Sequence, residues 1–163
     1  MSCEKIIEAQ RLRPHEDLVS GAAVAPGAYP MVKIRASSLE TIPARPLHHQ
    51  ATNEIVRDLL KYDEIPGITN LSHVALPPGD IIERHVHPTK YEVFMVLSGG
   101  GRFKVWSPGA DVNDEPREVI HLKTGVSVNV GPEEPHEIAP TGEEALVMLY
   151  FGVVAPNSPS FDV

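Results

Sequence analysis

Hydrophobic and polar positions alternate over short runs from Gly67 onward, and turn-forming residues such as Pro77-Pro78-Gly79 separate these runs. A period of two is expected of strands that bury one face and expose the other. The pattern predicts eight strands, at Ile68–Leu76, Asp80–His87, Glu92–Leu97, Gly101–Trp106, Glu118–Leu122, Ser127–Val130, His136–Ala139 and Ala145–Val153. Short strands at this regular spacing are typical of an all-β sandwich or jelly-roll barrel.

The first 66 residues do not share the strand pattern. We expect two short helices there, at Glu4–Arg13 and at Asn53–Leu60. In the second, Val56, Leu59 and Leu60 recur at i, i+3 and i+4, which is the spacing of one helix face. The predicted organisation is therefore an N-terminal arm (1–66) that packs on the barrel or on a partner, the barrel itself (67–155) and a loose C-terminal tail (156–163).

Composition narrows the class of protein. A chain of 163 residues fits one domain, and its 12 Gly and 16 Pro suit a protein of many turns. The formal net charge of −8 argues against a nucleic-acid partner, and no apolar run is long enough to span a membrane. Cys3 is the single cysteine and the N-terminus lacks a signal pattern, so we expect a cytoplasmic protein without disulfides.

Four side chains have the chemistry of metal ligands. His85 and His87 are two residues apart, so on a strand both point to the same face. Glu92 follows a turn and lies on the next predicted strand, and His136 follows a turn-forming segment far downstream. Three imidazoles and one carboxylate suit a divalent transition metal such as Fe, Mn, Co, Ni, Cu or Zn, and the ligand set does not choose among them.

The spacing of these residues resembles a known family motif. Gly79, five residues, His85-x-His87, four residues, Glu92, six residues and Gly99 is similar to the first motif of the cupin superfamily. The resemblance covers residues 68–152. It implies a double-stranded β-helix, the RmlC-like jelly roll, with one metal inside the mouth of the barrel.

A second cupin motif is present in weaker form. Gly125 and His136 stand at the expected spacing, but Gly131 and Glu133 occupy places where the family usually has Pro and Gly. Pro140 stands where the family usually has Asn. The resemblance implies that the family's four metal ligands are His85, His87, Glu92 and His136 in this chain.

The pocket beside the metal is expected to be apolar. By alternation from Glu92, Phe94 and Val96 should face the barrel interior and form the pocket floor. His73, on the preceding strand, is a further pocket candidate, and a histidine bonded to a neighbouring loop is its alternative role.

Two classes of function are compatible with this site. Four protein ligands leave positions open for a small-molecule substrate or O₂, which favours an enzyme acting on a small oxygenated or acidic metabolite. Within that class we favour an Fe-dependent dioxygenase in which Glu92 also acts as a base, with isomerase or lyase chemistry as the alternative. The other class is a non-catalytic cupin that binds a small acid through the metal, because the sequence offers no evident acid–base residue beyond the ligands.

The outward positions of the strand after the motif histidines are also apolar. Val93, Met95 and Leu97 should face away from the barrel interior. Cupins commonly dimerise through such surfaces, so the resemblance implies a homodimer.

Overall fold

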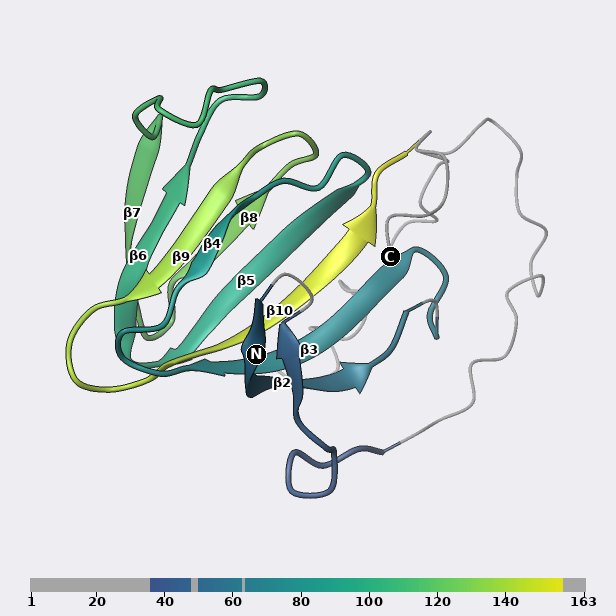
Figure 1. Cartoon of the computed structure of the whole chain (residues 1–163). Coiled ribbons are helices and arrows are strands. Elements are labelled where there is room, and N and C mark those ends of the chain that lie inside the picture. The colour runs from purple at the N-terminus through teal and green to yellow at the C-terminus, as the bar shows by residue number, and fades with distance from the viewer. Residues whose placement is uncertain (1–35, 48–49, 63, 157–163) are drawn as a thin grey trace, which may run out of the picture. The chain divides into compact units, whose positions relative to one another are not determined.

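The computed structural model describes residues 36–47, 50–62 and 64–156, and this part of the chain contains ten strands and no helix (Figure 1). The strands form two antiparallel sheets. The larger sheet has the order β1 (Arg45–Leu47), β2 (Gln50–Leu60), β3 (Ile68–Leu76), β10 (Leu146–Val154), β5 (Lys90–Ser98) and β8 (Ser127–Val130). The smaller has the order β4 (Ile82–His85), β9 (His136–Pro140), β6 (Gly100–Val105) and β7 (Glu118–Lys123).

All eight predicted strands are confirmed, and their observed ends differ from the predicted ones by at most two residues. The difference matters only in β4, which ends at His85 and leaves His87 in the following loop. Among the described residues, no helix is long and apolar enough to cross a membrane.

The helix expected over residues 53–60 is wrong, because this segment belongs to strand β2. Val56 pairs with Val74 and Asp58 pairs with Ser72 in the antiparallel ladder with β3. Val56 and Val74 are both fully buried. A short apolar run fits the period of a helix as well as that of a strand. Here the pairing with β3 favours the strand, because it supplies backbone hydrogen-bond partners and buries the apolar side chains. The helix expected at Glu4–Arg13 lies outside the described residues.

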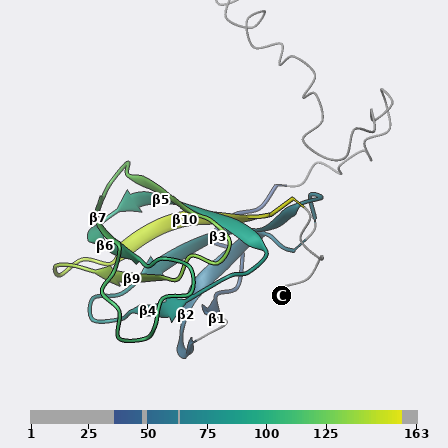
Figure 2. The same cartoon turned by 90° about the horizontal axis from the view of Figure 1, so that it is seen from above.

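The two sheets face each other (Figure 2), and the core side chains come from the strands of both. Along β5, side chains that point into the core alternate with side chains that point outward. Phe94 and Val96 are 4% and 2% exposed, whereas Met95 and Leu97 are 47% and 40% exposed. The strand thus places one row in the core and one on the outer face of the larger sheet. The remaining core residues are Ile55, Val56, Val74, Leu76, Ile82, Phe103, Val105, Leu122, Val128, Val130, Ile138, Leu146 and Met148.

Gly99 marks the corner where the chain leaves the larger sheet at the end of β5 and enters the smaller one at β6. Its φ of 76° lies in the left-handed region, and a Cβ at this position would collide with the carbonyl oxygen of Ala145. Only glycine satisfies both conditions, which explains its place in the motif.

The homodimer stays a prediction. Light scattering at micromolar concentration should give about twice the chain mass of 17.8 kDa, because Met95 and Leu97 expose apolar surface on the larger sheet. Met95→Lys should move the mass toward one chain. A mass near 17.8 kDa for the unchanged protein would contradict the prediction.

Candidate metal centre

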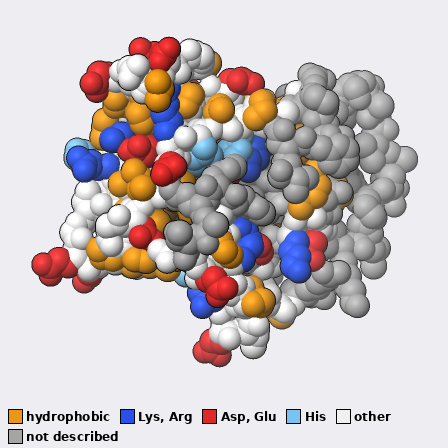
Figure 3. All heavy atoms as spheres, viewed as in Figure 1, with side chains coloured by type: hydrophobic (Ala, Val, Ile, Leu, Met, Phe, Trp, Pro, Cys, Tyr) orange, Lys and Arg blue, Asp and Glu red, His pale blue; other side chains and the backbone are white. Residues whose placement is uncertain are grey.

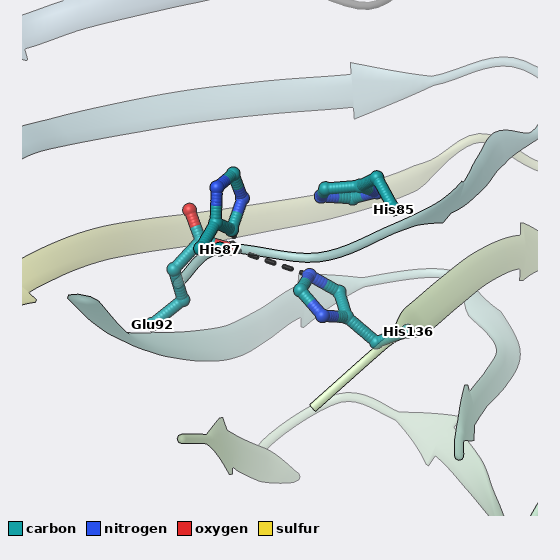
Figure 4. Close-up of side chains that lie close together, drawn as sticks. All are labelled: His85, His87, Glu92 and His136. Atoms are coloured by element: carbon teal, nitrogen blue, oxygen red, sulfur yellow. Dashed lines mark ion pairs between the residues drawn. The ribbon is translucent and has the colours of Figure 1, made fainter. Parts of the chain in front are cut away.

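The four expected ligands converge at the seam between the two sheets (Figure 4). One ligand atom from each of His85, His87, Glu92 and His136 lies within 4.8 Å of the other three. Glu92 projects from β5 of the larger sheet, whereas the histidines come from β4, the loop after it and β9 of the smaller sheet. Residues 51 positions apart in sequence, at 85 and 136, therefore share one site.

Strand pairing explains how the histidines meet. His85 and His136 are direct partners in the ladder between β4 and β9, and their ring centroids are 4.3 Å apart. His87 lies beyond the end of β4, where its carbonyl oxygen accepts a hydrogen bond of 2.9 Å from the backbone N–H of Glu133. The loop that carries His87 is thereby tied to the turn that leads into His136.

Two backbone carbonyls orient the imidazoles. Nδ1 of His85 lies 2.8 Å from the carbonyl oxygen of Glu83, and Nδ1 of His136 lies 3.0 Å from that of Glu134. A carbonyl oxygen can only accept, so in each neutral ring Nδ1 carries the proton and Nε2 carries the lone pair. Both rings therefore present an unprotonated nitrogen as a ligand atom.

Electrostatics at the centre favour a bound cation. Burial, followed by the effect of His136, lowers the pKa of His85 to about 3, so this ring is neutral at physiological pH. Burial opposes ionisation of Glu92, but His136, His87 and Lys90 outweigh it and hold the pKa of the carboxyl well below its usual range. A neutral His85 ring thus lies beside an ionised carboxylate.

The surroundings of the buried Nε2 of His136 indicate whether a metal ion fits this site. Nε2 of this ring lies 3.3 Å from Oε2 of Glu92 and, within the described part of the chain, has no hydrogen-bond partner. A buried lone pair facing a carboxylate oxygen is unfavourable unless a cation lies between them. The donor set of three nitrogens and one oxygen therefore fits a divalent transition metal.

Lys90 contacts the same carboxylate from the other side. Its Nζ lies 3.0 Å from Oε1 of Glu92, while Oε2 faces the imidazoles of His87 and His136 at 3.3 Å. Sequence reasoning missed this residue, although it stands two positions before Glu92 and alternation alone places it on the same face.

An acidic turn positions His136. Glu134 accepts a hydrogen bond of 2.8 Å from the backbone N–H of Gly131, and its other oxygen accepts one of 2.8 Å from Arg117. These two contacts hold the pKa of the Glu134 carboxyl below its usual value. Glu133 adopts a φ of 63°, at the position where cupins usually have glycine.

A pocket of about 360 Å³ opens beside the ligands. Its floor includes Phe94 and Tyr150, whose rings stack at 5.6 Å with an interplanar angle of 17°. Burial is the main cause that raises the pKa of Tyr150, so its hydroxyl keeps its proton. In the space-filling view, histidine side chains are visible near the middle of this face with basic side chains beside them (Figure 3).

The far wall of the pocket comes from the N-terminal strands. Arg45 on β1 makes a bidentate ion pair with Asp58 on β2, in which Nε lies 2.6 Å from Oδ2 and Nη2 lies 2.8 Å from Oδ1. Ser72 of β3 donates a further hydrogen bond of 2.7 Å to Asp58. The sequence pattern did not predict this wall, because it assigned residues 53–60 to a helix. Only the strand conformation of β2 directs Asp58 toward Ser72 and the pocket.

The structure places the three expected pocket residues in different environments. Phe94 lines the pocket, and Val96 lies two positions further along β5 in the core, outside the lining. His73 is not among the residues that line this pocket, and it pairs with Arg57 and Leu149 on the outer face of the larger sheet. Its neighbour Val74 takes the inward position and lines the pocket instead.

Replacing Glu133 with glycine should stabilise the protein. A left-handed conformation costs an ordinary residue about 1 kcal/mol relative to glycine, so Glu133→Gly should raise Tm by about 3 °C in calorimetry. Glu134→Ala is the control and should lower Tm, because the N–H of Gly131 loses its acceptor. A lower Tm for Glu133→Gly would contradict the strain argument.

The comparisons with known proteins agree on a family. The Cupin domain family matches residues 72–152, and no curated protein matches the chain. A solved structure described as a predicted oxalate decarboxylase from Thermotoga maritima is 20% identical, with a TM-score of 0.61, and the match covers 74% of this chain and 99% of that one. A protein with a double-stranded β-helix domain from Klebsiella pneumoniae is 23% identical, with a TM-score of 0.53 and coverage of 80% and 96%.

A cupin protein from Bacteroides fragilis is 18% identical, with a TM-score of 0.51 and coverage of 73% of this chain and 91% of its own. At these identities the structural similarity establishes the fold, while the family match includes all four converging ligands. The chain belongs to the cupin superfamily.

Proposed function

We propose that this cupin is a metal-dependent enzyme that acts on a small anionic, oxygen-containing metabolite, as an iron-dependent dioxygenase. The observation that carries the proposal is the convergence of three histidines and Glu92, of which His85, His87 and Glu92 line the wall of a pocket. Bound there, a divalent metal would polarise a substrate oxygen and, if it is iron with two positions left, would allow substrate and O₂ to react together.

The charges of the lining support an anionic substrate. Arg45, Lys61 and Lys90 contribute three positive charges to the pocket. Asp58, Glu83 and Glu92 contribute three negative ones, so the side-chain charges cancel. A divalent ion would leave the pocket positive although the whole chain carries −8, and this local field favours an acid over a neutral or cationic compound.

Two lining residues support catalysis over simple binding. The protonated hydroxyl of Tyr150 can donate a hydrogen bond to a substrate oxygen, and Lys90 adds a cation beside the ligands. The stacked rings of Tyr150 and Phe94 give the substrate an apolar surface and help to exclude water.

The role of base expected for Glu92 is disfavoured. Its Oε2 faces two imidazoles and its Oε1 pairs with Lys90, so both oxygens already have partners among the protein side chains. Tyr150 is the better candidate for proton exchange with a substrate, because burial keeps its hydroxyl protonated.

Metal binding should stabilise the chain through these ligands. Protein freed of metal by a chelator should gain about 2.7 kcal/mol of unfolding free energy when Fe(II), Mn(II) or Co(II) is added at a hundred times its dissociation constant. His136→Ala should abolish most of this gain. His121→Ala removes an exposed histidine on β7 and is the matched control, which should behave like the unchanged protein. Equal stabilisation of both variants would refute the site.

Oxygen chemistry has its own test. Under anaerobic conditions the Fe(II)-loaded protein should bind nitric oxide and give the electron paramagnetic resonance signal of an iron–nitrosyl centre. A screen of small carboxylic acids should then find one whose addition causes O₂ uptake. Binding of nitric oxide with conversion of an acid but without O₂ uptake would identify an isomerase or lyase instead. A site that ignores both nitric oxide and azide would exclude the dioxygenase.

A further inference from the structure

The two oxygens of Glu92 have different surroundings. Oε2 lies 3.3 Å from Nε2 of both His87 and His136 and is the oxygen that faces the ligand cluster. Oε1 lies 3.0 Å from Nζ of Lys90. The Glu92 side chain is 5% exposed and the Lys90 side chain 14%, so little water competes for this contact. A charge-assisted hydrogen bond at such a shielded position is strong and directional.

The backbone and side chains around Lys90 fix it in place. Lys90 pairs with Val154 at the start of the ladder between β5 and β10, and the preceding carbonyl of Thr89 accepts a hydrogen bond of 2.8 Å from Ala155. A Cβ on Gly152 would lie 3.3 Å from Cδ of Lys90 and would collide with the hydroxyl of Thr69. The missing side chain at Gly152 leaves the space that the lysine stem crosses to reach Glu92.

We propose that Lys90 is a positioning residue that keeps Glu92 bound to the metal through one oxygen only and so preserves the coordination positions that face the pocket. The inference rests on the metal binding proposed above. A ligating carboxylate can bind through one oxygen or through both, and binding through both would occupy a position that a substrate needs. Residues that hold a ligand's second polar atom commonly decide such a choice.

This role separates Lys90 from the other lysine of the same pocket. Lys61 also lines the pocket and carries the same charge, but it follows the end of β2 in the chain, and the ion pair with Glu92 is made by Lys90. Removing either lysine changes the pocket charge by one unit. Only removal of Lys90 takes away the partner of Oε1, which makes Lys61→Met the matched control.

The test uses Co(II) as a spectroscopic probe in the full chain. The visible absorption of Co(II) weakens as its coordination number rises, and azide reports on positions that remain open. In Lys90→Met, freed Oε1 should join the metal, so the visible bands should lose intensity and azide affinity should fall about tenfold. Lys61→Met should keep the spectrum of the unchanged protein and should lower azide affinity less than Lys90→Met does, because it removes one pocket charge but not the partner of Oε1. Lys90→Arg, which retains a cationic donor, should restore most of both.

Several results would overturn the inference. An unchanged spectrum and azide affinity in Lys90→Met would show that Lys90 does not control the binding mode. Loss of Co(II) binding in that variant would mean that the lysine only keeps Glu92 in the site. Lys90→Gln provides a second neutral variant if Lys90→Met does not fold, with the same expected changes. Failure of the unchanged protein to bind Co(II) would instead refute the proposed metal site itself.

Discussion

The close approach of four polar side-chain atoms is the constraint around which this site is built. One nitrogen from each of three imidazoles and one oxygen of Glu92 are held within 4.8 Å of one another in a largely buried position. Such an arrangement would relax in a flexible chain, because each group would turn toward water. It persists here because three of the four side chains are restrained from outside the cluster. Carbonyls of Glu83 and Glu134 hold the rings of His85 and His136, and Lys90 holds the carboxylate of Glu92.

The position of the site at the seam between two sheets adds to this rigidity. Glu92 belongs to the larger sheet, while His85 and His136 pair with each other in the smaller one. The two sheets share a close-packed core that includes Phe94 and Phe103, whose rings meet at 5.2 Å. A displacement of one sheet would therefore disturb the core as well as the ligands, so the packing of the barrel also fixes the spacing of the site.

The pocket has two halves of different origin. The half with the metal ligands comes from the region that matches the Cupin domain family, residues 72–152. The opposite wall comes from earlier residues, in particular the ion pair between Arg45 and Asp58. The candidate ligands thus come from the matched region and the opposite wall from residues before it, and that wall is the natural place for substrate selection.

Sequence alone determined the strands from Ile68 onward and the four side chains that cluster as candidate metal ligands, because alternation and motif spacing are local properties of the chain. It could not determine that residues 53–60 pair as a strand, since their short apolar run fits two periodicities and only contact with β3 distinguishes them. The sheet face on which His73 lies and the stacking of Tyr150 on Phe94 also depend on strand order and register. Which side chains from distant segments share one cavity is a property of that pairing, so only the tertiary structure decided the pocket beside the candidate metal ligands.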